Sequence, residues 1–293
     1  MGANSGLRFG VLTPVVYRPP GQANEWERAG TVDDVVRIVG AADRLGYHHV
    51  TCSEHVGIPL AVDRHRGATY WEPVSTLSFL AGKTVRIRMA THVIVLGYHH
   101  PLALTKTCGT LDRLSGGRLV LGVGVGSLVE EFDLLGANFP LRGKWADEAI
   151  RALRASWRRG RPEFHGTFYD FSDFVLDPLG VQDRLPIWVG GSSERSLQRA
   201  ISLGDGWVPF GRTPQELGDM LGALVLPPDF EVVLECTRLD PLRSPEEARR
   251  RVTQLVNAGA TIINAAFVHE NSDECVEQLE AMRTLFPEAQ WGA

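Results

Sequence analysis

Two glycines and two serines stand where a short apolar run gives way to a helix-like segment. They are Gly190, Gly191, Ser192 and Ser193, after "LPIWV" and before "ERSLQRAISLG". The free N–H groups and the positive dipole end of a helix start favour an anion, and glycine permits its close approach. The segment therefore indicates a phosphate site. The same residues also suit a tight turn before a serine-capped helix, which needs no ligand.

A second glycine-rich stretch, "GRLVLGVGVGS" at 117–127, has glycine at positions 122, 124 and 126. A dinucleotide-binding loop needs the spacing GxGxxG in the turn after the first strand. Here the spacing is GxGxG, inside the fourth strand-like run of the chain. Glycine within a strand usually marks the close approach of a ligand or another backbone. We expect a neighbour to press against the end of this strand.

The composition narrows the classes of partner. The 293 residues carry a net charge of −5, so we expect no nucleic acid as main partner, and no apolar run approaches the ~20 residues that span a bilayer. The four cysteines form no CxxC pair and the nine histidines no HExxH spacing, so no metal is expected. The first residues lack a signal-peptide pattern. We therefore expect a cytoplasmic protein with reduced cysteines.

Eight strand-like runs alternate with amphipathic helical segments. The runs span residues 7–14, 47–55, 84–96, 118–126, 185–191, 205–211, 229–236 and 260–269. Continuous apolar strands are typical of parallel sheets buried on both faces, and a (β/α)8 barrel has ~250 residues. We predict an α/β fold, a single (β/α)8 TIM barrel over residues 1–293. A doubly wound sheet is the rival with the same strand count.

Two connections are long enough to be insertions. Residues 53–75 follow the second run, so in a barrel they lie at the C-terminal face, where active sites form. Residues 159–185 precede the fifth run, and "FHGTFYDF" within them predicts a small hairpin. Helix starts are marked by Thr31 with Asp34 and by "SPEE" at 244–247, both typical of capping boxes.

Longer segments resemble the luciferase-like monooxygenase superfamily, and within it the shorter branch that uses the deazaflavin coenzyme F420. The matching segments occur in family order: "EH" at 54–55, then residues 90–126, 141–153 and 186–210, and the closing "NAGATIINAAF". The resemblance spans nearly the whole chain and is weak from 212 to 243. It implies a (β/α)8 barrel, in agreement with the strand count.

The resemblance also implies where a cofactor binds. Family members hold a flavin or deazaflavin ring at the C-terminal mouth of the barrel, against a third-strand bulge with a non-prolyl cis peptide. By position, that peptide is His92–Val93 here. The phosphate falls on the turn at 190–193, and Gly126 and Glu130 lie beside the cofactor. The fourth-strand glycines are then interpreted as clearance next to that phosphate.

Glu54 and His55 match an acidic residue and a histidine of related F420-dependent dehydrogenases. Imidazole titrates near neutral pH, so His55 could exchange a proton with substrate or contact the ring; a histidine that only bonds its neighbours is the alternative. Those dehydrogenases carry a catalytic glutamate where this chain has Ser127, which puts their sugar-phosphate chemistry in doubt. Glu131 either meets the cofactor or only begins a helix, and the helix interpretation is favoured.

The expected activity is that of an F420-dependent oxidoreductase that transfers hydride between the deazaflavin and a small organic substrate. The alternative is a luciferase-like monooxygenase that uses FMN, reduced by a partner reductase, and O2. A further alternative is a barrel that binds a cofactor or ligand without catalysis. A homodimer is expected.

Overall fold

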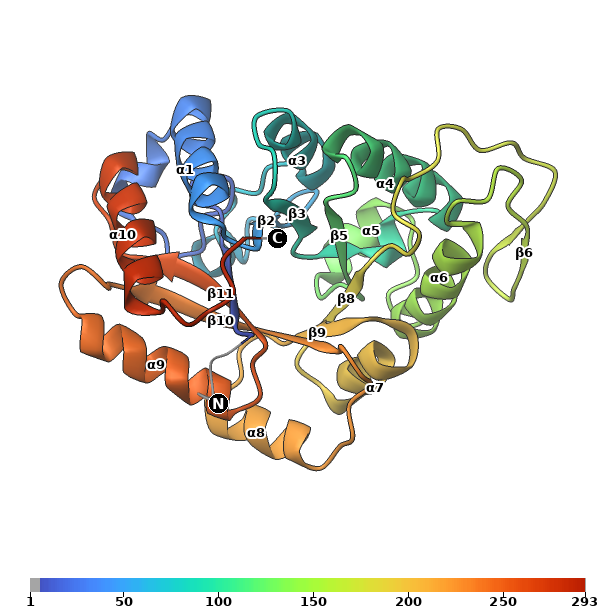
Figure 1. Ribbon diagram of the computed structural model, residues 1–293. Helices are drawn as coiled ribbons and strands as arrows, with labels where there is room; N and C mark the ends of the chain where they lie inside the picture. Colours follow the sequence, from blue (N-terminus) through green and yellow to red (C-terminus); the bar gives the residue numbers. More distant parts are fainter. Residues whose placement is uncertain (1–5, 293) are drawn as a thin grey trace.

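All neighbouring strands of the main sheet run parallel, and the sheet closes on itself. The computed structural model describes residues 6–292. The order is β3-β2-β1-β11-β10-β9-β8-β5-β4, and pairing of β3 with β5 completes the ring (Figure 1). The strands are β1 (Arg8–Val11), β2 (His49–Cys52), β3 (Arg88–Thr91), β4 (Ile94–Val95), β5 (Leu119–Gly124), β8 (Ile187–Gly190), β9 (Gly206–Val208), β10 (Glu231–Leu239) and β11 (Ile262–Phe267). The predicted (β/α)8 barrel is confirmed, with β3 and β4 as two halves of one barrel strand.

Helices surround the barrel, and the longer ones bury one apolar face each, whereas the short helix at residues 63–66 buries no residue. They are α1 (Val32–Leu45), α2 (Asp63–Arg66), α3 (Pro73–Ala81), α4 (Pro101–Ser115), α5 (Val129–Leu134), α6 (Arg142–Ser156), α7 (Glu194–Leu203), α8 (Pro214–Gly222), α9 (Pro245–Asn257) and α10 (Ser272–Leu285), with the 3-10 turns η1 (Glu25–Arg28) and η2 (Leu96–Tyr98). The predicted hairpin is also present, because β6 (Phe164–His165) pairs antiparallel with β7 (Asp170–Phe171) and projects from the barrel (Figure 1).

The two predicted capping boxes have different outcomes. At the start of α1, the Thr31 hydroxyl accepts from the Asp34 N–H and the Asp34 carboxylate accepts from the Thr31 N–H, as predicted. The helix α9 begins at Pro245 as expected, but Ser244 makes no side-chain capping bond. Its ψ of 58° departs from the extended backbone in which a capping side chain reaches the first helical turn.

The third barrel strand is divided by a cis peptide between His92 and Val93, as predicted. The resulting bulge presses on the next strand. A Cβ at Gly122 would overlap the carbonyl oxygen of Thr91, and one at Gly124 would lie 2.7 Å from Cγ2 of Val93. A Cβ at Gly190 would lie 3.0 Å from Cγ1 of the same side chain. The neighbour that these glycines admit is therefore the bulge itself, which corrects their interpretation as clearance beside a phosphate.

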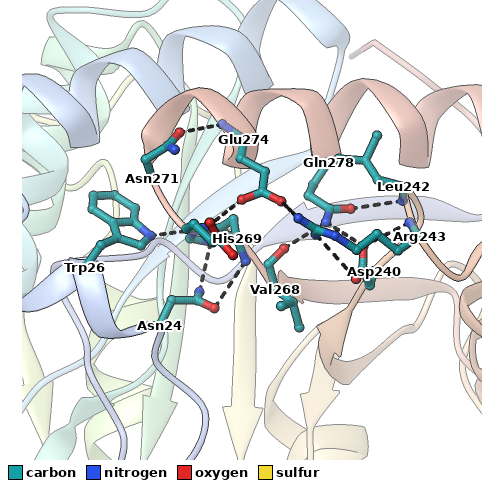
Figure 2. Close-up of polar contacts among 11 residues, drawn as sticks. Asn24, Trp26, Asp240, Leu242, Arg243, Val268, His269, Asn271, Glu274 and Gln278 are labelled. Atoms are coloured by element: carbon teal, nitrogen blue, oxygen red, sulfur yellow. Dashed lines mark hydrogen bonds and ion pairs between the residues drawn. The ribbon is translucent and has the colours of Figure 1, made fainter.

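A network of partly buried polar groups ties the loop after β1 to the segment after β11 (Figure 2). The indole Nε1 of Trp26 donates to Nδ1 of His269 at 2.9 Å, and Asn24 Oδ1 accepts from the His269 N–H at 3.2 Å. Burial lowers the pKa of His269 to about 4, so the ring is neutral and can accept. The neighbouring Gln278 amide donates to Asp240 Oδ1 and the Val268 carbonyl. The loop that carries Tyr17 is thereby fixed at the mouth of the barrel, its C-terminal end.

The close approach at Gly122 makes a test of the fold. We expect Gly122→Ala to lower the free energy of unfolding by about 3 kcal/mol, the upper part of the range for overpacked cores, because backbone must move. Urea denaturation followed by tryptophan fluorescence measures the effect. Gly160→Ala is the matched control, since a Cβ there meets nothing within 4 Å. Equal stability of the two variants would contradict the packing described.

Candidate active site

A histidine and a buried glutamate meet at the mouth. His55 follows β2, and Glu131 lies on α5, after β5. The His55 Nδ1 lies 2.7 Å from Glu131 Oε2, which also accepts from the Tyr98 hydroxyl at 2.9 Å. The other oxygen accepts from the N–H groups of Val56 and Gly57, at 2.7 and 3.2 Å. A carboxylate on Nδ1–H fixes the tautomer and leaves the Nε2 lone pair of His55 free to act as a base.

Glu131 is held as a carboxylate by its surroundings. Burial alone would raise its pKa, but the hydrogen bond and charge of His55, the Gly57 N–H and the Tyr98 hydroxyl together lower it below its ordinary value. The expectation that Glu131 only begins a helix is therefore wrong. Its helix position is ordinary, and its partner lies 76 residues away in the sequence, so no local pattern could have revealed the pair.

Glu54 contacts the segment that follows the His92–Val93 bulge. Its Oε2 accepts from the Val95 N–H at 2.6 Å, and its Oε1 lies 2.7 Å from His99 Nε2. Burial would lower the pKa of His99, but the Glu54 carboxylate raises it through a hydrogen bond and its charge. Both oxygens of Glu54 thus hold the segment after the cis peptide. A direct catalytic role for Glu54 stays a prediction.

The bulge residues face the barrel interior. The His92 carbonyl accepts from the Ser53 hydroxyl at 2.8 Å, and the His92 ring meets Phe210 edge-on with centroids 5.3 Å apart. Burial lowers the pKa of His92 to about 4, so the ring is neutral. The side chain of Val93 fills the space left by the glycines of β5 and β8.

Side-chain hydrogen bonds hold the turn after β8. Gly191 has a φ of +128°, and its carbonyl accepts from Trp207 Nε1 at 2.9 Å and from the Ser196 hydroxyl at 2.6 Å. Ser193 and Ser196 cap the start of α7 reciprocally. This cap occupies the Ser196 N–H; the earlier N–H groups of a helix have no partner within it and can bind an anion. An adjoining open groove of about 850 Å³ is lined by Arg142, Lys144, Arg151, Arg195 and Arg199 together with Asp147 and Glu194, and Arg199 is paired with Asp147.

The remaining predicted cofactor residues lie after β5. Gly126 has a φ of +80°, and a Cβ there would lie 2.6 Å from Phe132, so packing requires glycine with or without a ligand. Glu130 is exposed on α5. Ser127, at the position of the related dehydrogenases' glutamate, accepts from Arg66 Nη1 at 3.2 Å. The binding roles of Gly126, Glu130 and residues 190–193 stay predictions.

Two tyrosines cover the His55 side of the mouth. The rings of Tyr17 and Tyr70 have centroids 5.1 Å apart, and Tyr70 lies edge-on to His55 with centroids 4.4 Å apart. Burial raises the pKa of both phenols, so both are neutral. Tyr70 comes from the long 53–75 connection, which therefore reaches the mouth as predicted.

Comparison with known proteins shows the family. A model of the luciferase-like monooxygenases matches residues 7–225, and the chain belongs to this family. An uncharacterized protein of Mycobacterium tuberculosis is 31% identical over 198 residues, which cover 64% of this chain and 68% of that protein. The oxygenase component of a flavin-dependent trigonelline monooxygenase from Acinetobacter baylyi is 27% identical over 190 residues, 64% of this chain and 50% of that protein.

Solved structures support the fold. An F420-dependent secondary alcohol dehydrogenase in complex with an F420–acetone adduct superposes with a TM-score of 0.75 at 15% identity, over 97% of this chain and 99% of that one. The monooxygenase RslO1 from Streptomyces bottropensis gives 0.69 at 22% identity, over 96% and 98%. Relatives and neighbours thus include both F420- and flavin-dependent enzymes, and membership of the luciferase-like monooxygenase family supports an oxidoreductase.

Metal centres and membrane-spanning helices are two further classes of feature that bear on function. Within residues 6–292, no cluster of three or more His, Cys, Asp or Glu side chains is arranged to hold a metal ion. None of the helices in that range combines the length and apolar character needed to cross a membrane.

The Glu131 carboxylate makes a prediction about stability and pH. Replacement by Gln turns one oxygen into an amide that faces donors, so we expect Glu131→Gln to lose about 1–3 kcal/mol of unfolding free energy at pH 7. Because the folded-state pKa is lowered, the carboxylate stabilises the fold above the unfolded pKa of about 4.3 and less as pH falls below it. The difference in unfolding free energy between the parent and Glu131→Gln should therefore become smaller at acidic pH.

Thermal unfolding from neutral to acidic pH measures this difference. Asp133→Asn is the control, an exposed carboxylate on the same helix. A constant difference between the parent and Glu131→Gln across the pH range would contradict the assignment.

Proposed function

We propose that the protein is an F420-dependent oxidoreductase that exchanges hydride between the deazaflavin and a small organic substrate bound at the mouth. The observation that carries the proposal is the His55–Glu131 pair, 2.7 Å apart, at the same end of the barrel as the His92–Val93 bulge. Hydride exchange with an alcohol or carbonyl group needs a partner that moves one proton, and an oriented imidazole suits that task.

The residues present fit an anionic cofactor. The capped start of α7 offers N–H groups and a positive dipole to a phosphate. Arg142, Lys144 and Arg195 line the adjoining groove and suit further anionic groups of a cofactor tail. The bulge at 92–93 supplies a fixed surface against which a planar ring can lie.

The chain's own residues then perform the acid–base part of the reaction. A bound deazaflavin supplies hydride chemistry. The Nε2 of His55 takes the hydroxyl proton of an alcohol substrate, or returns one to a carbonyl oxygen in the reverse direction. Glu131 stabilises the imidazolium that forms, as an acidic partner does in hydrolase triads. Tyr17 and Tyr70 restrict water beside the ring.

The second candidate is a monooxygenase that receives reduced FMN from a partner reductase. Two curated relatives favour it, the trigonelline monooxygenase component and an FMNH2-dependent dimethylsulfone monooxygenase of Pseudomonas putida, 26% identical over 196 residues. The third candidate is a barrel that binds a cofactor without catalysis. It is supported by Ser127, which stands where the dehydrogenases have a catalytic glutamate.

Cofactor titration separates these candidates. We expect the purified protein to bind F420 more tightly than FMN. A titration that monitors the fluorescence of each cofactor measures the two dissociation constants. In a panel of alcohols and carbonyl compounds, His55→Asn should lower kcat about 10²–10⁴-fold while the F420 dissociation constant changes little.

His165→Asn is the matched control, an exposed histidine on the outer hairpin that also pairs with carboxylates. Preferential FMN binding would favour the monooxygenase. Binding without turnover of any substrate would favour the non-catalytic barrel. An equal loss of kcat and F420 affinity in His55→Asn would make His55 a ring-positioning residue.

A further inference from the structure

A half-buried arginine lies beside the His55–Glu131 pair at the mouth. Arg66 ends α2, within the long connection after β2. Its Nη1 donates to the Ser127 hydroxyl at 3.2 Å, and its carbonyl oxygen accepts from the Tyr70 hydroxyl at 3.2 Å. Tyr70 in turn lies edge-on to the His55 ring. Arg66 thus joins the segments after β2 and β5, the same two segments that the His55–Glu131 pair joins.

The positive charge of Arg66 has no acidic partner within residues 6–292. A guanidinium stays protonated across the physiological pH range, so this charge is permanent. The Glu131 carboxylate nearby is already occupied by His55, the Tyr98 hydroxyl and two backbone N–H groups. Burial raises the pKa of the Tyr70 and Tyr98 phenols, and the charge of Arg66 acts in the opposite direction on both. The guanidinium is therefore close to the proposed proton carrier and available to an anion.

An open groove of about 1020 Å³ leads outward from the same connection, between the loop after β1 and the end of β10. Its charged lining residues in the described part of the chain are Arg18, Glu25, Arg28, Asp63, Arg64 and Arg238. Glu25 pairs with Arg28 at 3.5 Å. The other three arginines form no ion pair within residues 6–292, and Asp63 is the remaining acid, so the groove has an excess of positive charge. Such a groove raises the local concentration of small anions.

The backbone that carries these arginines is held in place. The first loop and the connection pair through an antiparallel bridge between Tyr17 and Tyr70. On β10 the register shifts between Cys236 and Leu239, and Arg238 within this irregularity has a φ of +53°. A bulge at the end of a strand redirects a side chain and is common next to active sites. The arginines therefore converge on the groove from three separate barrel loops.

The groove lies across the mouth from the turn proposed for the cofactor phosphate. With β3 and β4 counted as one strand of the closed order, β1 is four strands from β8 in either direction. An anion that enters through the groove thus reaches Arg66 from the side opposite to residues 190–193. That is the approach of a molecule separate from the cofactor.

We propose that Arg66 binds an oxyanion of the substrate, a carboxylate or a phosphate, beside His55, and that the arginines of the groove draw such substrates to the mouth. This inference rests on the proposed function and names its substrate class, a small alcohol or carbonyl compound that carries a negative group. A guanidinium pairs with an oxyanion through two parallel hydrogen bonds. Because Nη1 is taken by Ser127, the edge formed by Nε and Nη2 remains for the substrate.

The binding part is tested on the protein without cofactor, at constant pH and ionic strength. The probes are acetate and inorganic phosphate, with acetamide as the neutral analogue of acetate. In protein with ¹⁵N-labelled histidine, the ring signals of His55 should shift with either anion and not with acetamide. Arg66→Gln should abolish the shift. Arg161→Gln is the matched control, an exposed arginine before the outer hairpin, and should keep it.

The anion that shifts His55 at the lower concentration identifies the preferred oxyanion. A parent protein whose His55 signals respond to neither anion, or equally to acetamide, overturns the inference, whether or not Arg66→Gln folds. A response that persists in a folded Arg66→Gln also overturns it.

The specificity part is tested with pairs of compounds that differ in the charged group, 2-hydroxy acids with their amides and hydroxyalkyl phosphates with the corresponding diols. We expect the parent to prefer the anionic member. Arg66→Gln should lower the ratio of kcat/KM for the anionic over the neutral member about 10–100-fold, as expected for lost hydrogen bonds to a charged group. Arg66→Lys should retain part of the ratio, and Arg161→Gln all of it.

A parent that prefers the neutral member, or an unchanged ratio in Arg66→Gln, overturns the inference while the proposed function stands. Because salt screens exposed charges, kcat/KM should fall with ionic strength more steeply for the anionic member, and equal salt dependence overturns the role of the groove. If the parent turns over no substrate with F420 or FMN, the proposed function fails, and the NMR result still decides whether Arg66 holds an anion.

Discussion

The close approach of the bulge to β5 is the constraint on which the mouth depends. At Gly122 and Gly124, the backbone has no side chain toward the third barrel strand, and Thr91 and Val93 occupy that space. The strand can therefore break into β3 and β4 without leaving the barrel. The break turns His92 toward Glu235 and brings Val95 within reach of Glu54. A side chain at Gly122 would overlap the Thr91 carbonyl oxygen, so it would prevent this bulge whether or not a ligand binds.

Buried carboxylates hold the backbone segments around the mouth in place. Glu54 accepts from the Val95 N–H of β4 and lies 2.7 Å from His99 Nε2 in the segment that follows. Glu131 accepts from backbone after β2. Glu27 does the same for the first loop, where it accepts from the Val15 N–H at 2.9 Å. Each is satisfied by several donors, which offsets the cost of burying a charge. The loops of three barrel strands thus hold their positions through ionic hydrogen bonds rather than through apolar packing alone.

The sequence predicted what depends on local pattern and family position. Eight apolar runs indicated the eight barrel strands, and the resemblance located the cis peptide at His92–Val93. The sequence alone could not predict that Glu131, rather than its neighbour Glu130, turns inward to His55. That choice depends on contacts between segments that are distant in the sequence. The same holds for Glu235 and His92, and for the bulge as the neighbour of the β5 glycines. The Ser244 cap failed for a local reason, a ψ angle that residue types alone do not fix.

The pairing of β1 with β11 has a consequence for how the chain is made. The first strand of the barrel finds one of its two neighbours among residues 262–265, near the end of the chain. The loop after β1 also depends on His269 for its anchor. During synthesis, every barrel strand before β11 leaves the ribosome while β1 still has an unpaired edge. Such edges attract other chains, so the nascent protein is exposed to misassembly until its last strand emerges.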